Sequence, residues 1–292
     1  MPSTTKCTVL ISGCSDGGTG SALAKEFHAR GLRVYATARN VSKMQTLASI
    51  QGIELLALDI SSPDSIADCV KRVPELDILV NNAGTQYTMP ISDLDIAEAK
   101  KLFDANVWGH IAITQAFLPL LLRSEKGMVV NHTSVGAGLV MPLQAAYNAS
   151  KAAMATFSDT LRLEMENTFG IKVVQLRTGG VKTNIITNSQ AKQFVIPEKS
   201  IWAPVRERID DILKLGWAEK FRIPAEQWAK QVVGDLLKES PAKTIWRGEM
   251  AWLVRIMGAV LPSGWMDSIS KSNIKLGEVE RAVRGARREK VA

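Results

Sequence analysis

The sequence has few residues that form disulfides or bind metal ions. It contains three cysteines (Cys7, Cys14 and Cys69) and three histidines in 292 residues. The cysteine number is odd, no Cys-x-x-Cys spacing occurs and the histidines are far apart in the chain, so neither a disulfide framework nor a metal site is predicted. This pattern is typical of a reducing, intracellular compartment.

Long apolar runs are also missing. The most apolar stretch late in the chain, residues 251–261, includes Arg255 and is shorter than the roughly 20 apolar residues that span a bilayer. A strand pattern begins almost at the N-terminus, so no secretory signal is expected. We therefore expect a cytoplasmic protein in which residues 251–261 form a buried or interface helix. Contact of this helix with a membrane surface, such as the endoplasmic reticulum or a lipid droplet, is an open alternative.

The sequence shows no basic patch of the kind that binds nucleic acid. Its formal net charge is +7, but the basic residues are spread out and no aromatic residues alternate with them, so no nucleic-acid partner is predicted. Part of the excess lies in a C-terminal tail, which is expected to be solvated.

Short β-branched runs alternate with amphipathic stretches through most of the chain. The predicted strands cover residues 7–12, 32–37, 54–58, 77–81, 128–132, 171–177 and 244–247. The predicted helices cover residues 21–30, 41–50, 63–72, 92–106, 108–123, 143–169 and 224–238. This alternation predicts an α/β fold with a doubly wound parallel sheet of the Rossmann type.

No linker divides the chain into two separate domains. Residues 1–247 are expected to form one Rossmann-type domain, which includes an irregular or helical substrate lid at about 185–216. Residues 248–292 are expected to form a C-terminal helical extension that ends in the basic tail.

A glycine-rich loop lies between the first predicted strand and the first predicted helix. Its candidate phosphate-binding residues are Gly13, Ser15, Gly18, Thr19 and Gly20. Glycines let the backbone approach a pyrophosphate, and the following helix N-terminus favours an anion. Asp16 is an unfavourable neighbour for phosphates and is expected to cap a helix instead.

The end of the second predicted strand distinguishes between two cofactors. NAD-binding proteins of this fold carry an acidic residue there for the ribose 2′-hydroxyl. This chain has Arg39 and no carboxylate in the run Ala36-Thr37-Ala38-Arg39-Asn40. A guanidinium can pair with a 2′-phosphate, so NADP(H) is the predicted cofactor.

Three side chains can move a proton without a metal. Tyr147 and Lys151 are four residues apart on a predicted helix, and Ser134 ends an apolar run upstream. Positions i and i+4 share a helix face, so we expect the Lys151 ammonium to lower the pKa of the Tyr147 phenol. Tyr147 could then act as a general acid or base, with Ser134 bonded to the same substrate oxygen.

Together these motifs resemble the short-chain dehydrogenase/reductase family over residues 8–183, in order and in spacing. By this resemblance the adenosine half of the cofactor contacts Asp59, Ile60, Asn82, Ala83 and Gly84. The nicotinamide half contacts Lys151, Gly179, Val181 and Thr183, and Asn106 holds a water that links Lys151 to solvent. Asn82 has an alternative role as a structural bridge between strands.

Three departures from the family pattern occur. Ser12 stands where the family usually has threonine, the Gly17-Gly18 pair lengthens the loop by one residue, and Thr178 replaces the usual proline before the nicotinamide loop. None of them alters the four candidate catalytic residues, Asn106, Ser134, Tyr147 and Lys151.

The predicted function is an NADPH-dependent carbonyl reductase of a bulky apolar ketone. The loop and the extension resemble fungal relatives that are similar to 1-acyl-dihydroxyacetone-phosphate reductases and to secondary-metabolite ketoreductases. The alternatives are such an acyl-phosphate reductase, an NAD-dependent alcohol dehydrogenase, a lipid-surface reductase and a cofactor-sensing binding protein on the same fold. The predicted substrate-lining residues are Val140, Met141, Pro142, Leu143, Trp202 and Trp217. The resemblance also implies a homo-dimer or tetramer that forms through the helices near Trp108 and Tyr147.

Overall fold

The computed structural model describes residues 6–185, 195–213, 221–262 and 264–289. These residues form one seven-stranded parallel sheet with the strand order β3-β2-β1-β4-β5-β6-β7. The strands are β1 (Thr8–Ser12), β2 (Arg33–Ala38), β3 (Ile53–Ala57), β4 (Ile78–Asn81), β5 (Met128–Ser134), β6 (Lys172–Thr178) and β7 (Thr244–Arg247). The order reverses between β1 and β4, so the predicted doubly wound Rossmann sheet is confirmed.

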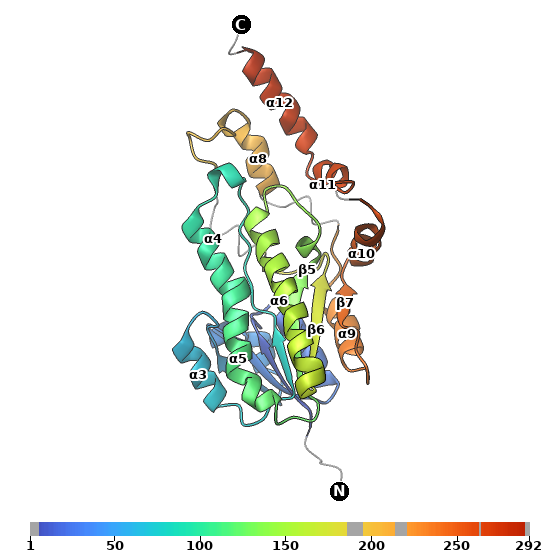
Figure 1. Cartoon of the computed structure of the whole chain (residues 1–292). Coiled ribbons are helices and arrows are strands. Elements are labelled where there is room, and N and C mark those ends of the chain that lie inside the picture. The colour runs from blue at the N-terminus through green and yellow to red at the C-terminus, as the bar shows by residue number, and fades with distance from the viewer. Residues whose placement is uncertain (1–5, 186–194, 214–220, 263, 290–292) are drawn as a thin grey trace.

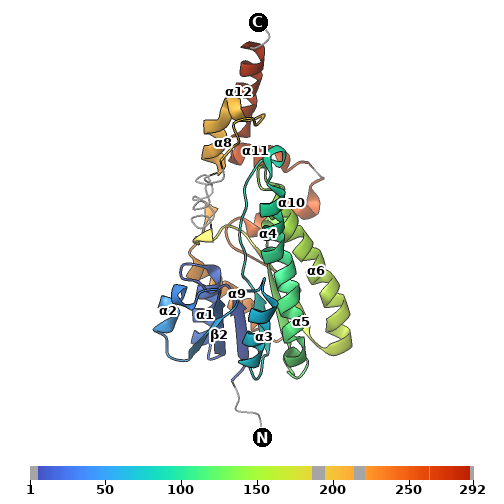
Figure 2. The same ribbon diagram turned by 90° about the vertical axis from the view of Figure 1, so that its left-hand side faces the viewer.

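Helices cover both faces of the sheet (Figures 1 and 2). One apolar cluster joins β1 and β2 to α1 (Thr19–Ala29), α2 (Gln45–Ala48) and α9 (Ala225–Leu236). The other joins the opposite face to α3 (Pro63–Lys71), α5 (Gly109–Leu121) and α6 (Ala145–Phe169). Central strands such as β1 and β4 are buried along their whole length, because helices shield both of their faces.

Two predicted helices differ in the structure. Residues 92–106 and 108–123 were expected to form separate helices, but α4 (Ile96–Phe103) continues into α5 through a π-helical segment, Asp104–Trp108. The Gly109 N–H reaches back to the Asp104 carbonyl, so the hydrogen-bonded helix is not interrupted. The helix starts late because the Asp95 carboxylate caps the N–H groups of Ala97 and Glu98.

The predicted helix 41–50 is also shorter and broken. A 3₁₀ turn, Val41–Lys43, precedes α2, and the Asn40 side chain accepts from the Ser42 N–H at its start. The Asp16 carboxylate accepts from both the backbone N–H and the hydroxyl of Thr46. Asp16 therefore caps a helix, as predicted, although the helix is α2 and not the one that follows the glycine loop.

The lid segment and the C-terminal extension share a third apolar cluster. The described lid residues form a 3₁₀ turn, Ala203–Val205, and α8 (Arg206–Leu213). The extension forms α10 (Ala251–Val260), α11 (Asp267–Asn273) and α12 (Leu276–Glu289). Val205 and Ile209 of the lid pack with Ile274 and Val279 of the extension. Both segments lie at the end of the molecule opposite the N-terminus (Figures 1 and 2).

Candidate active site

The glycine loop is packed too tightly for side chains at two of its glycines. A Cβ added to Gly13, which has a φ of +76°, would lie 2.7 Å from the Ala83 Cα. A Cβ added to Gly20 would lie 2.3 Å from the Gly13 carbonyl oxygen. Helix α1 begins directly behind the loop, and no described side chain caps its N-terminus. Its free N–H groups suit a phosphate.

Asn82 ties the loop to the neighbouring strands. Its side-chain amide donates to the Ser12 carbonyl at 2.8 Å and to the Gly13 carbonyl at 3.1 Å. Its Oδ1 atom accepts from the Thr19 hydroxyl at 2.8 Å. The Ser12 hydroxyl accepts from the Asn82 and Ala83 N–H groups. The structure therefore places Asn82 as the bridge that the sequence offered as its alternative role, and Ser12 supplies the hydroxyl that this position needs.

Ser134, Tyr147 and Lys151 come together at the carboxyl end of β5. Ser134 is the last residue of that strand, and the two others lie in the first two turns of α6. The Ser134 hydroxyl lies close enough to the Tyr147 phenol to lower its pKa. The Lys151 Nζ atom lies 5.9 Å from the centre of the Tyr147 ring and donates to the His132 carbonyl at 3.1 Å. This arrangement can present a hydroxyl pair to one oxygen of a substrate.

The prediction that Lys151 lowers the pKa of the Tyr147 phenol is wrong. Burial raises the pKa of Tyr147 above its ordinary value, and the nearby Ser134 hydroxyl lowers it only in part. Burial also lowers the pKa of Lys151 to about 8, because a charged ammonium is costly away from water. The amine therefore does not keep the phenol acidic, and Tyr147 is a protonated donor at neutral pH.

Asn106 lies in the π-helical segment, fully buried beside the lysine. Its Oδ1 atom accepts from the Thr85 N–H at 2.9 Å, and its amide donates to the Thr85 carbonyl and to the Ser150 hydroxyl. A Cβ on Gly84 would lie 3.2 Å from this Oδ1 atom and 3.7 Å from the Lys151 Nζ atom. Asn106 therefore fixes the segment after β4 against α6, and its role in a water relay stays a prediction.

The residues predicted for the adenosine half lie at the adjacent strand ends. Arg39 follows β2 and is exposed, and within the described residues its side chain has no hydrogen bond or ion pair. Asp59 follows β3, and its carboxylate accepts from the Ser61 N–H at 3.0 Å. Ile60 is buried beneath Gly109, where an added Cβ would meet it at 2.8 Å. These side chains share the sheet edge with Gly13 and Ala83.

The 179–183 loop follows β6, and its end contacts the glycine loop. A Cβ at Gly179 would lie 2.1 Å from the Glu249 carbonyl oxygen, so only glycine fits there. Val181 is bridged to Ile223. One residue after Thr183, Asn184 donates its N–H to the Gly17 carbonyl at 3.1 Å. The two predicted cofactor loops are therefore in contact through Asn184 and Gly17.

On the substrate side, the residues after Ser134 separate into two groups. Met141 and Leu143 are buried in the cluster that includes Tyr147 and the lid, while Val140 is 71% exposed. Pro142 is half-buried, and so is Trp202, whose indole N–H donates to the Ser92 hydroxyl at 3.0 Å. Trp217 lies outside the described residues.

Comparison with known proteins decides the family. The family model described as short chain dehydrogenase matches residues 7–193. The chain belongs to the short-chain dehydrogenase/reductase family. A short-chain dehydrogenase/reductase of Pestalotiopsis microspora is 49% identical over 282 residues, which cover 96% of this chain and 98% of that protein.

Two further similarities bear on this family member. An NADPH-dependent 1-acyldihydroxyacetone phosphate reductase of Schizosaccharomyces pombe is 39% identical and covers 87% of this chain and 89% of its own length. A solved short-chain dehydrogenase of Streptomyces avermitilis is 26% identical with a TM-score of 0.73, and the match covers 97% of this chain and 99% of that one. The protein is therefore an oxidoreductase with the Rossmann fold, as predicted.

Sequence reasoning about this short-chain dehydrogenase missed two histidines. His110 and His132 are far apart in the chain, yet both are buried close enough to Lys151 for its charge to lower their pKa values, after burial itself. His110 bonds the Ala83 carbonyl through Nε2 at 2.7 Å. A signal was present for His132, because Asn131-His132-Thr133-Ser134 is an unusually polar end for a central strand.

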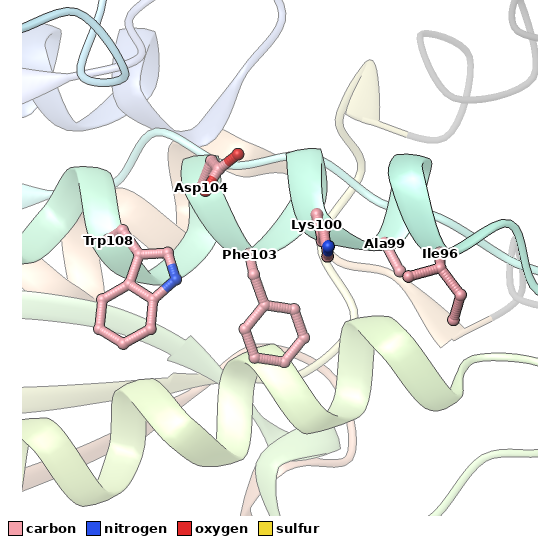
Figure 3. Close-up of a pocket in the computed structure, with 6 residues that line it drawn as sticks. All are labelled: Ile96, Ala99, Lys100, Phe103, Asp104 and Trp108. Atoms are coloured by element: carbon pink, nitrogen blue, oxygen red, sulfur yellow. The ribbon is translucent and has the colours of Figure 1, made fainter.

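A groove of about 280 Å³ follows α4 and the π-helical segment (Figure 3). Ile96, Ala99, Lys100, Phe103, Asp104 and Trp108 line it. Trp108 is 54% exposed and contacts Phe157 of α6 edge to face, at 5.9 Å between ring centres. This apolar face belongs to the helices on which the family resemblance places the oligomer contact.

Proposed function

We propose that the protein is an NADPH-dependent carbonyl reductase that transfers hydride to a ketone of a bulky apolar substrate. The observation that carries this proposal is the meeting of Ser134, Tyr147 and Lys151 with the glycine loop. Gly84 links the two groups, since its neighbour Ala83 touches Gly13 while Gly84 itself lies against Lys151. A hydroxyl pair and a dinucleotide cradle at one sheet edge fit carbonyl reduction.

The cradle fits a nicotinamide dinucleotide. Gly13 and Gly20 let the loop fold tightly against Ala83 and against itself, and the start of α1 behind this loop offers N–H groups without a side-chain cap. Arg39, exposed and unpaired within the described residues, suits a 2′-phosphate. The Schizosaccharomyces pombe relative, whose name states NADPH dependence, supports the same choice.

The residues of this chain would divide the reaction as follows. The bound cofactor supplies hydride to the carbonyl carbon. Tyr147 donates its phenolic proton to the carbonyl oxygen, and its raised pKa keeps that proton in place at neutral pH. Ser134 donates a second hydrogen bond to the same oxygen. Lys151 stabilises the Tyr147 phenolate that remains. By family resemblance, Lys151 also holds the nicotinamide ribose, and Asn106 supports the reprotonation of the phenolate.

The apolar side of the site favours a bulky substrate. Met141, Leu143 and Trp202 join Tyr147 in the cluster that also holds α8 and α12. A ketone from fungal secondary metabolism fits this surface. The second candidate substrate is a 1-acyl-dihydroxyacetone phosphate, which the name of the Schizosaccharomyces pombe relative favours.

Two contacts outside the site form part of the proposal. The α4 groove and Trp108 supply an apolar face for a homo-dimer or tetramer. The α10–α11 face, defined by Trp252, Ile256, Val260, Trp265 and Ile269, is at least 40% exposed at each residue and suits peripheral contact with a lipid surface from the cytoplasm. Within the described residues, no helix combines the length and the hydropathy needed to cross a bilayer.

The test is a carbonyl panel read by loss of reduced-nicotinamide absorbance. It should contain bulky aryl ketones, aliphatic ketones and an acyl-dihydroxyacetone phosphate, each with NADPH and with NADH. Turnover of a ketone with NADPH preferred is the expected result. Preference for NADH would overturn the cofactor proposal, and binding of NADPH without turnover of any carbonyl would favour a cofactor-sensing protein.

A further inference from the structure

Four polar side chains form a continuous hydrogen-bonded row beneath the site. They are Thr19 at the start of α1, Asn82 after β4, His132 on β5 and Thr178 at the end of β6. We call these residues the cross-strand chain. Thr19 bonds Asn82 at 2.8 Å, Asn82 bonds the His132 Nδ1 atom at 2.9 Å, and the His132 Nε2 atom bonds the Thr178 hydroxyl at 2.7 Å. The row thus joins the glycine loop to the residue directly before the 179–183 loop.

The surrounding bonds fix the direction of each proton. Both amide protons of Asn82 are used by the Ser12 and Gly13 carbonyls, so its Oδ1 atom can only accept. The His132 Nδ1 atom must therefore carry the ring proton, and Nε2 accepts from the Thr178 hydroxyl. Burial holds the pKa of His132 well below its usual range, which keeps the ring neutral and this lone pair available.

His132 has little freedom to leave this position. Its ring stacks on the fully buried Trp228 of α9, with 5.2 Å between ring centres and 24° between planes. Its backbone carbonyl accepts from the Lys151 Nζ atom. A proline at position 178, as the family usually has, would offer no hydroxyl to the ring. The pairing of His132 with Thr178 is therefore a property of this chain's own residues.

We propose that His132 is a positioning residue that couples the two loops. The affinity for a ligand at the glycine loop then depends also on the hydrogen bond between His132 and Thr178. This inference rests on the proposed function, because it requires a nicotinamide dinucleotide to bind across both loops. A hydrogen-bonded chain between two sites carries such coupling when it has two discrete arrangements, which here are the His132–Thr178 bond made and the same bond broken. Loss of the Thr178 hydroxyl should then be felt at a site that Thr178 does not touch.

The experiment uses a ligand that reaches only the glycine-loop half. ADP-ribose, with and without a 2′-phosphate, lacks nicotinamide and therefore cannot make the nicotinamide contacts proposed for the 179–183 loop. Its dissociation constant is measured by calorimetry for wild type, Thr178→Val and Thr178→Ser. Thr178→Val should weaken the preferred fragment about fivefold or more, the lower end of typical coupling between sites. Thr178→Ser keeps the hydroxyl and should bind like wild type.

Two control variants distinguish coupling through the cross-strand chain from a nonspecific destabilisation of the strands and loops around it. Thr133→Val removes a buried hydroxyl from the same strand as His132, bonded to the Leu176 carbonyl and outside the cross-strand chain. Thr183→Val alters the 179–183 loop without touching the cross-strand chain. Neither should weaken the fragment, although Thr183→Val should weaken full NADPH. Melting temperatures of all variants show whether each is folded.

The outcomes separate the inference from the proposed function. Wild-type affinity of folded Thr178→Val for the fragment, or equal weakening by Thr133→Val, would overturn the coupling alone. A wild-type protein that binds no form of the dinucleotide would overturn the proposed function and the coupling together.

Discussion

The carboxyl edge of the sheet buries polar side chains, whereas the C-terminal extension exposes apolar ones. Both are departures from the usual pattern of apolar residues inside and polar residues outside. At the edge, Asn82, Asn106, His132 and Lys151 are polar, yet none is more than 9% exposed. In the extension, Trp252 and Trp265 are apolar, yet they are 63% and 66% exposed. Each departure costs free energy, so each indicates a task other than folding.

The two regions differ in how their cost is offset. These four side chains of the polar edge each form hydrogen bonds within the chain, which reduces the penalty of burial and fixes their geometry. Within the described residues, no other part of the chain covers the α10–α11 face. Only a surface outside the chain could offset the cost of its exposed apolar side chains. The hydrogen bonds of the edge therefore support the proposed site, and the exposure of the face supports the proposal that it contacts a partner.

The largest expected effect comes from the polar edge. Tyr147→Phe removes the proton donor and should lower turnover by about 10²- to 10⁴-fold, the usual contribution of a general acid. NADPH affinity should be unchanged, because the phenol acts on the substrate oxygen. Steady-state kinetics and nucleotide titration measure the two effects. Tyr35→Phe is the control, since the Tyr35 hydroxyl is buried without a partner among the described residues. Ketone reduction by Tyr147→Phe at the wild-type rate would remove Tyr147 from the mechanism.

Lys151→Met should separate activity from stability. The lysine is buried and its pKa falls from 10.5 to about 8, so the folded protein holds its proton less tightly than the unfolded chain. Removing this strained charge should raise the free energy of unfolding at pH 7 by about 2 kcal/mol while abolishing most turnover.

The stability difference between Lys151→Met and wild type should depend on pH. Between pH of about 8 and 10.5 the unfolded chain binds more protons at this lysine, so wild-type stability gains from rising pH in that window. Urea unfolding at pH 7 and pH 10 should show the advantage of Lys151→Met shrinking at the higher pH. An advantage that stays constant or grows would show that the Lys151 ammonium is not destabilised by burial.

Much of this edge could be predicted from local sequence. The glycine loop, Arg39, Ser134 and the Tyr147–Lys151 spacing each follow from position relative to a strand or helix, and the parallel sheet brings their strand ends together. The π-helical segment at Asn106 could not be predicted, because its sequence contains no helix breaker and the bulge depends on tertiary bonds to Thr85 and Ser150.

The rest depended on burial, which sequence shows poorly. The rule that a cation lowers a phenol pKa predicts the wrong direction for Tyr147, because burial raises the pKa of this phenol and is the larger effect. His132 joined the site only through contacts with Asn82 and Thr178, which are 50 and 46 residues away in the chain. The length and apolar composition of residues 251–261 predict a buried or interface helix, but they do not show that Trp252, Ile256 and Val260 are exposed.

A smaller effect is expected at the rim of the polar edge. Arg39→Asp should raise the Michaelis constant for NADPH about 10- to 100-fold, because it removes a charged partner of the 2′-phosphate and adds a repulsive carboxylate. The constant for NADH should change little. Arg72→Asp, on the surface at the end of α3, carries the same charge change and should leave both constants unaltered. An unchanged NADPH preference in Arg39→Asp would contradict the cofactor proposal.

The smallest effect on turnover is expected at the exposed face. Trp252→Ser with Ile256→Ser should leave reduction of a soluble ketone within about twofold of wild type, but lower binding to vesicles of phosphatidylcholine and phosphatidylserine at least about tenfold. Co-sedimentation measures the bound fraction. The control changes two exposed apolar residues of α6, Leu163→Ser with Phe169→Ser, and should bind like wild type. If wild-type protein stays wholly in the supernatant, the face does not bind lipid. In that case we would expect the α10–α11 face to bind a protein partner, because an exposed apolar face usually marks an interaction surface.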